Sequence, residues 1–152
     1  MTDTRRIASL LHRHGALSVW DYAAAAPYLD IDMAAAISRD MASMCTNSGQ
    51  SCNAPSRMLV HEDQMETVLS YLVDEVNKFV LGDPRDPKTT MGPVVSAAQF
   101  DSIQNHIQIG IAEGGRVVVG GAGRPDGMNR GFFVKPTVFA DITPEMTLAR
   151  SE

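Results

Sequence analysis

The sequence predicts an α/β fold, part of a three-layer arrangement in which helices cover both faces of a mostly parallel sheet. Short apolar runs typical of buried strands alternate along the chain with longer stretches whose apolar residues recur at the helical period. Glycines and prolines separate these segments, and 44% of the 152 residues are hydrophobic. A compact unit of this length buries roughly 68–70% of its unfolded surface, so the core requires neither disulfides nor a metal.

Three helices follow from the apolar spacing. The first is predicted over 33–46, where Asp32 can cap it and the apolar positions are Met33, Ile37, Met41 and Met44. A second apolar stripe covers 65–80. The third begins at Ser96, which can form a capping box with Gln99, and a glycine pair at 114–115 closes it.

Four apolar stretches are predicted as strands, at 57–61, 116–119, 132–134 and 137–139. A polar loop with several prolines is predicted over 82–93, and a glycine-rich turn region over 120–131. The sequence stops at Ser151 and Glu152 directly after an apolar stretch, which indicates a fragment with an incomplete sheet.

The segment 1–29 differs from the rest and is of uncertain structure. Residues 4–14 form a short basic amphipathic stretch, for which a surface helix and an organelle transit peptide are both considered, the helix being favoured. His12 and His14 are two residues apart and would point to different faces of a helix, so they predict no metal site.

Charge and composition exclude several classes of partner. The net charge is −5 and the basic residues are scattered, which argues against binding of nucleic acid or acidic lipid. The longest apolar runs are much shorter than the roughly 18–20 residues that span a bilayer. Two cysteines in a chain without a signal-peptide profile favour a reducing, cytoplasmic location.

The polar stretch N-S-G-Q-S-C-N-A-P-S-R, residues 47–57, places Cys52 in a turn between two elements. A thiolate in a tight turn is a good nucleophile, and the backbone N–H of Cys52 could help hold an oxyanion. From residue types alone, a small buried hydrophobic role for this cysteine is the stronger interpretation. Cys45 falls on the apolar face of the first predicted helix and fits that role better. A disulfide between the two is disfavoured in a reducing compartment.

Residues 47–57 strongly resemble the active-site cysteine segment of the aldehyde dehydrogenase superfamily, and further matches follow in order and spacing. These are D-I-D-M at 30–33, L-G-D-P at 81–84, M-G-P at 91–93, G-F-F-V-K-P-T-V-F at 131–139 and M-T-L-A-R-S-E at 146–152. The resemblance covers residues 30–152 and implies a partial catalytic domain of this superfamily. It reverses the interpretation of Cys52, which becomes the expected catalytic nucleophile.

The resemblance implies oxidation of an aldehyde to a carboxylic acid. The Cys52 thiolate would attack the aldehyde, the thiohemiacetal would pass a hydride to NAD or NADP, and water would hydrolyse the thioester. Glu152 matches a glutamate that binds the ribose on the nicotinamide side of the cofactor. Arg57 is expected to brace the loop through an ion pair or backbone contacts.

Departures from the family leave a second interpretation open. Ser18 stands where the resemblance expects the general-base glutamate, and the glycines at 120–131 form no G-x-G-x-x-G between a strand and a helix. The alternative is therefore a catalytically inactive remnant that associates with full-length relatives. Homo-oligomerisation is also left open, and a redox-responsive thiol protein is a third, weaker hypothesis.

Overall fold

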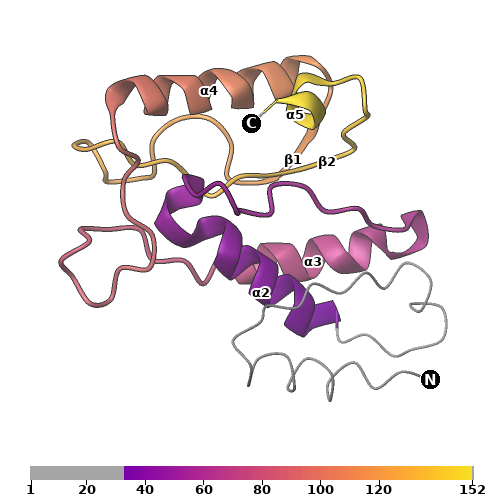
Figure 1. Cartoon of the computed structure of the whole chain (residues 1–152), viewed down its shortest axis with the longest axis horizontal. Coiled ribbons are helices and arrows are strands. Elements are labelled where there is room, and N and C mark those ends of the chain that lie inside the picture. Colours follow the sequence, from indigo (N-terminus) through magenta and orange to yellow (C-terminus); the bar gives the residue numbers. More distant parts are fainter. Residues whose placement is uncertain (1–32, 152) are drawn as a thin grey trace, which may run out of the picture. The chain divides into compact units, whose positions relative to one another are not determined.

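The computed structural model describes residues 33–151 of the chain (Figure 1). The expectations for 1–29, including the helix at 4–14, His12, His14 and Ser18, lie outside the described residues. The cap at Asp32 and the predicted cofactor residue Glu152 lie outside them too.

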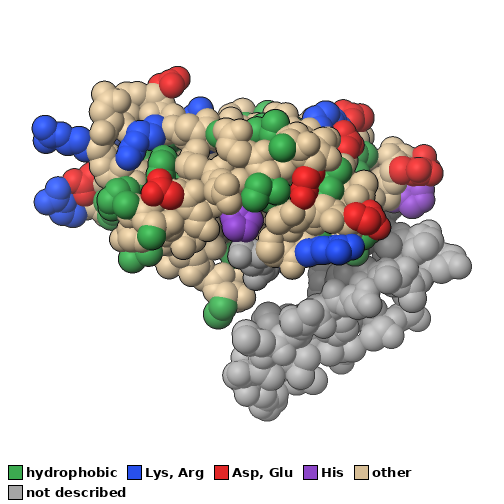
Figure 2. Space-filling view, turned by 90° about the horizontal axis from the view of Figure 1, so that it is seen from above, with side chains coloured by type: hydrophobic (Ala, Val, Ile, Leu, Met, Phe, Trp, Pro, Cys, Tyr) green, Lys and Arg blue, Asp and Glu red, His purple; other side chains and the backbone are tan. Residues whose placement is uncertain are grey.

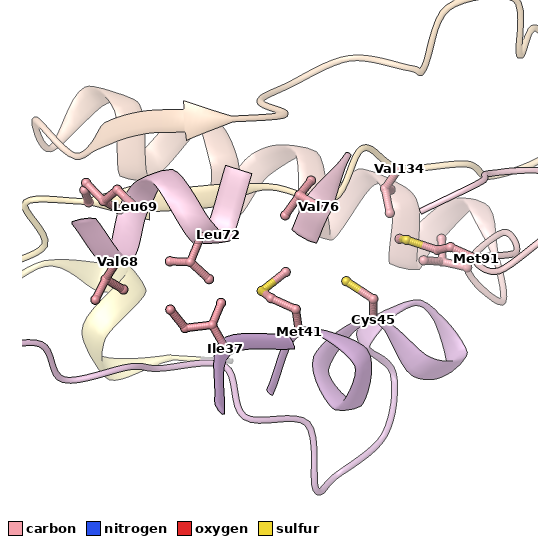
Figure 3. Close-up of a cluster of buried hydrophobic side chains, with 11 residues drawn as sticks. Ile37, Met41, Cys45, Val68, Leu69, Leu72, Val76, Met91 and Val134 are labelled. Carbon is pink, nitrogen blue, oxygen red and sulfur yellow. The ribbon is translucent and has the colours of Figure 1, made fainter. Parts of the chain in front are cut away.

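The first two predicted helices are confirmed. Helix α2 spans Met33–Cys45 and helix α3 spans Met65–Val76, and the two pack against each other. Helix α3 ends earlier than its apolar stripe, because the backbone N–H of Asn77 and Lys78 already close a final turn on Val73 and Glu75. Their facing side chains form most of one hydrophobic core (Figure 3), whose buried members are Ile37, Met41, Cys45, Val68, Leu69, Leu72, Val76, Met91, Val94, Val134 and Ala140.

The third helix, α4, spans Ala97–Ala112 and begins where the capping pattern predicts. The Ser96 hydroxyl accepts a hydrogen bond from the backbone N–H of Gln99 at 3.2 Å. Gly114, with φ of +98°, follows the last turn in the left-handed region that glycine adopts without strain. Gly110 is buried on this helix, and an added Cβ would meet the side chains of Leu148 and Phe139, so these side chains pack closely against the helix here.

Two strands form the sheet of the described residues. Strand β1, Arg116–Val119, pairs with β2, Val138–Ala140, with a register irregularity between Val117 and Val119. Helix α3 contacts β1, while α4 lies on the other side of the strands (Figure 1), where Gly110 approaches Phe139. Helices on both faces of a sheet therefore agree with the predicted three layers.

Parts of the strand prediction were wrong. The two described strands pair antiparallel, and one such pair leaves the predicted, mostly parallel sheet of the whole domain untested. Residues 57–61 and 132–134 form no strand, and β2 lies one residue later than expected. A strand exists only with a hydrogen-bonded neighbour, and no described backbone segment runs beside 57–61. The apolar composition of residues 57–61 could not reveal that a hydrogen-bonded neighbour is lacking among the described residues.

The loop at 82–93 is exposed over most of its length but is anchored at both ends. Leu81 and Met91 form an isolated parallel bridge, and the N–H of Gly82 donates to the Met91 carbonyl at 3.2 Å. Within the loop, hydrogen bonds from Arg85 lower the pKa of Asp83 to about 2. Because Met91 and Val94 are buried, the end of this loop is fixed in the core.

A short last helix, α5, spans Thr147–Arg150 and packs on α4. The Glu113 carboxylate accepts hydrogen bonds from the N–H of Thr147 at 2.7 Å and from its hydroxyl at 2.6 Å. These bonds lower the pKa of Glu113, the side-chain bond being the larger cause. They fasten the segment that leads to Ser151 onto the end of α4.

Surface charge and the apolar character of the helices can be described for residues 33–151. On the face shown in Figure 2, acidic and basic side chains of the described part are interspersed and form no extended patch of one sign. Within residues 33–151, no helix combines the length and apolar character needed to cross a membrane.

We predict that Ile37→Ala lowers the free energy of unfolding by about 2–5 kcal/mol, because it opens a cavity at a side chain with no exposed surface. Urea titration at low micromolar protein concentration measures this change. Leu59→Ala is the matched control, since Leu59 is fully exposed, and it should change stability by less than about 0.5 kcal/mol. Equal losses in the two variants would contradict this placement of the core.

Candidate active site

The loop that carries Cys52 leaves α2 in an unusual backbone conformation. Three successive residues, Asn47, Ser48 and Gly49, have φ of 53°, 57° and 75°, all in the left-handed region. Glycine adopts this region freely and asparagine visits it, but a residue with a Cβ generally costs about 1–2 kcal/mol there. The loop therefore needs interactions that hold it in place.

Two hydrogen bonds tie this loop to residues 92–95. The buried Ser48 hydroxyl donates to the Gly92 carbonyl at 2.7 Å, and the Val95 N–H donates to Gln50 Oε1 at 2.8 Å. The other end of the Gln50 amide donates to the Asn47 carbonyl at 2.9 Å. A buried hydroxyl with a well-placed acceptor avoids the desolvation cost of an unpaired polar group. The loop is thus fastened to the part of the chain that Met91 and Val94 fix in the core.

Cys52 lies in the tight turn that follows. The N–H of Ala54 donates to the Ser51 carbonyl at 2.9 Å, which closes a turn with Cys52 at its second position. Its side chain is exposed and its thiol is free. Among the described residues, no backbone carbonyl accepts from the Cys52 N–H, so this donor is available to a ligand. The expectation of a cysteine presented by a polar turn agrees with this geometry.

Cys45 has the opposite environment. It is buried at the end of α2, and its side chain points into the same cluster as Met41 and Met91 (Figure 3). Burial disfavours the thiolate and raises the pKa of Cys45 to about 11. The predicted apolar role of Cys45 is confirmed, and the two cysteines form no disulfide.

Arg57 connects the end of the cysteine segment to the other end of the chain. Its Nη2 donates to the Ser151 carbonyl at 3.3 Å, across 94 residues. Ser151 is held in turn by the Thr147 carbonyl, which accepts from both its N–H and its hydroxyl at 2.9 Å. This is the backbone contact that was expected of Arg57. It brings the residue before Glu152 to the segment that follows Cys52.

The sequence analysis did not predict that residues 92–95 hold the loop before Cys52 through hydrogen bonds. The M-G-P match located them, but a single sequence does not show that Gly92 and Val95 contact a loop 44 and 45 residues away. The buried serine in a polar turn was the available signal, since a serine in such a position needs a partner. No group of three His, Cys, Asp or Glu side chains within 33–151 could hold a metal ion.

A model of the aldehyde dehydrogenase family matches residues 26–152. The chain belongs to this family. The resemblance drawn from residues 47–57 and the later motifs is therefore confirmed, and the α/β fold class agrees with the solved structures of the family.

Known members of the aldehyde dehydrogenase family show how much of the fold this chain covers. A 3-succinoylsemialdehyde-pyridine dehydrogenase of a Pseudomonas species is 40% identical over 123 residues, which are 81% of this chain and 26% of that protein. Aldehyde dehydrogenase C of Pseudomonas syringae, solved as a cysteine-to-alanine variant with NAD+ and octanal, is 37% identical with a TM-score of 0.78. A Mycobacterium tuberculosis aldehyde dehydrogenase solved with NAD+ is 39% identical with a TM-score of 0.77. Both structures are matched over 81% of this chain and 25% of their own length, so the chain spans about a quarter of these relatives.

The described residues do not fit a dinucleotide site by themselves. The glycine-rich region 120–131 follows β1, but it leads through turns to β2 and not into a helix. A phosphate-binding turn needs the N-terminus of a helix directly after it. The glycines at 120–131 are therefore turn residues, as the sequence predicted, and they form no phosphate-binding turn.

We predict that Ser48→Ala lowers the free energy of unfolding by about 1–3 kcal/mol, because the partly buried Gly92 carbonyl loses its partner. Denaturant titration measures the loss. Ser43→Ala, an exposed serine on α2, is the matched control and should stay within about 0.5 kcal/mol of the parent. If Ser48→Ala is as stable as the control, the hydrogen bond does not hold the loop.

Cys52 should react with iodoacetamide at least about tenfold faster than Cys45 in the folded chain, because one thiol is exposed and the other is buried. The raised pKa of Cys45 leaves about one thiolate per thousand at pH 8. Peptide mapping after brief labelling measures both sites. In denaturant the two rates should converge, and equal rates in the folded chain would refute the assignment.

Proposed function

We propose that this chain carries the nucleophile of an NAD(P)-dependent aldehyde dehydrogenase, which oxidises an aldehyde to a carboxylic acid through a cysteine thiohemiacetal and a thioester. One observation carries the proposal: Cys52 is exposed in a tight turn of the motif that resembles the family's active-site segment, and hydrogen bonds to Gly92 and Val95 hold the loop before it. Family membership supports the reaction class.

The first step follows from the position of Cys52. Its thiol loses a proton to solvent, the sulfur forms a bond to the aldehyde carbon, and the carbonyl π electrons move to oxygen. The unpaired backbone N–H of Cys52 can donate to this oxyanion, and a donor of this kind strengthens as charge develops. Protonation of the oxygen gives the thiohemiacetal. The described residues therefore account for capture of the aldehyde.

Bound NAD(P)+ would supply the hydride acceptor of this reaction. We assign no step of the hydride transfer to residues 33–151. Glu152 is proposed to accept hydrogen bonds from the ribose hydroxyls of the cofactor, which suits a carboxylate. The contact between Arg57 and the Ser151 carbonyl supports this role, because it brings the residue before Glu152 to the segment that follows Cys52.

A catalytically inactive chain that associates with full-length relatives is the second candidate function. It is favoured by Ser18 at the position where the family resemblance expects a general-base glutamate. We propose a cytoplasmic location, where reduced thiols persist. The two free cysteines support that location.

Acylation by 4-nitrophenyl acetate tests the nucleophile without any cofactor. Cys52 sulfur should attack the ester carbonyl, expel 4-nitrophenolate and keep the acetyl group as a thioester, with the thiol proton passing to buffer. We expect one acetyl group per chain, located at Cys52 by mass spectrometry. Cys52→Ala should abolish the modification, and Cys45→Ala should leave it unchanged. Acetylation of lysines or of Cys45 alone would refute the proposal.

The chain alone should show no substantial NAD(P)-dependent oxidation of aldehydes. Ser18 stands where the family resemblance expects the general base, and loss of a general base typically costs roughly 10²–10⁴-fold in rate. NADH formation from short aliphatic and aromatic aldehydes, with Cys52→Ala as the control, measures this activity. Turnover that depends on Cys52 at the ordinary enzymatic rate of about 1 s⁻¹ or more would overturn this expectation.

A further inference from the structure

Gln50 lies two residues before Cys52, and both ends of its side-chain amide are hydrogen-bonded. Its Oε1 accepts from the Val95 N–H at 2.8 Å, and its Nε2 donates to the Asn47 carbonyl at 2.9 Å. An exchange of the amide oxygen and nitrogen would set oxygen against oxygen at Asn47 and N–H against N–H at Val95. The two contacts therefore fix the orientation of the amide.

The backbone of Gln50 is fixed as well. Its N–H donates to the same Asn47 carbonyl at 3.2 Å, and its φ of −88° and ψ of 13° lie just outside the helical region. The chain continues from here into Ser51, which opens the turn that the Ala54 N–H closes. Because Cys52 is the second residue of this turn, the direction of its N–H depends on how Gln50 is held.

The other contact with residues 92–95 cannot replace that of Gln50. The Ser48 hydroxyl binds the Gly92 carbonyl on the far side of Gly49 from Cys52. Gly49 has φ of 75°, and glycine has wide freedom of rotation about its backbone bonds. The Ser48 contact therefore leaves the direction of the chain after Gly49 open, whereas the Gln50 contacts fix it on the side of the nucleophile.

We propose that Gln50 is a positioning residue for the nucleophile. Its amide orients the backbone N–H of Cys52 toward the oxyanion that forms when the Cys52 sulfur bonds to a carbonyl carbon. This inference rests on the function proposed for Cys52. An oxyanion donor stabilises the transition state only when it points to the place where the charge develops. Loss of the Gln50 amide should therefore slow reactions that form an oxyanion and spare those that form none.

Two reagents separate this positioning role from a general loss of structure. 4-Nitrophenyl acetate forms an oxyanion, because the Cys52 sulfur attacks its carbonyl carbon and the carbonyl π electrons move to oxygen. Iodoacetamide forms none, because the sulfur displaces iodide at a saturated carbon in one step. Both reagents consume the same thiolate. The ratio of the acylation and alkylation rate constants at Cys52 therefore largely cancels changes in the pKa and the exposure of the thiol.

Gln50→Met keeps the length of the side chain and loses both hydrogen bonds. We expect the ratio of acylation to alkylation to fall at least about fivefold, through the acylation rate alone. Gln50→Glu should also lower the ratio, because it keeps an acceptor for the Val95 N–H but its carboxylate cannot donate to the Asn47 carbonyl. This second variant serves as the test if circular dichroism shows that Gln50→Met is unfolded. Gln108→Met, at an exposed position on α4, is the matched control and should keep the parent ratio.

Peptide mapping by mass spectrometry after timed labelling measures both rate constants at Cys52. A parent ratio in both folded Gln50 variants would overturn the proposal, and so would equal falls in the two rate constants. A parent chain that is alkylated but not acylated at Cys52 would refute the proposed nucleophile and this inference together. An acylated parent whose ratio the Gln50 substitutions leave unchanged would refute only the role of Gln50.

Discussion

The hydrogen bond from the Ser48 hydroxyl to the Gly92 carbonyl is the interaction on which the candidate site depends. It lies where the backbone turns through three left-handed residues, a conformation that serine does not favour by itself. Net contributions of single hydrogen bonds are about 0.5–1.5 kcal/mol, but an unpaired carbonyl at a buried position costs more. The Val95 N–H also donates to Gln50 Oε1, so two hydrogen bonds to residues far along the chain hold the loop before Cys52.

The hydrophobic core explains why the hydrogen bond between Ser48 and Gly92 can hold the loop in place. Cys45 ends α2 directly before the loop, and Met91 and Val94 flank Gly92; all three belong to the same buried cluster. Both sides of the hydrogen bond are therefore attached to one packed unit. The two cysteines, which are only a few residues apart, have opposite environments. Cys45 contributes apolar packing and has a raised pKa, whereas Cys52 stands beyond the core in an exposed turn.

The sequence predicted what depends on local spacing. The apolar positions of α2, the capping residue Ser96 and the glycines after α4 identified the helices, and β-branched residues identified β1. Residues 57–61 have the composition of a buried strand, yet strand formation depends on a neighbour that composition does not reveal. The direction of β2 relative to β1 likewise follows from the path of residues 120–137, where glycines allow many routes.

The candidate site was predictable only in part, because local sequence patterns do not show contacts between residues that are distant along the chain. Cys52 could be singled out because its motif is contiguous and resembles a known family. Its supports could not, because Gly92, Val95 and Ser151 are distant in sequence and act through backbone atoms, which carry no residue-specific signal. Ser48, Gln50 and Arg57 supply the side chains of these contacts, and all three lie within the motif itself. The motif therefore contains the side chains that hold its own loop, while the rest of the fold contributes the backbone atoms that they contact.

The central claim is that folding makes Cys52 a better nucleophile than an ordinary exposed cysteine. The most direct measurement is the second-order rate constant for its acylation by 4-nitrophenyl acetate in the folded chain and in the urea-unfolded chain, both with Cys45→Ala. Because the turn supplies a fixed N–H donor to the developing oxyanion, the account predicts a rate at least about tenfold higher in the folded chain. An equal or faster rate in the unfolded chain would show that the loop merely exposes a thiol, and would contradict the account.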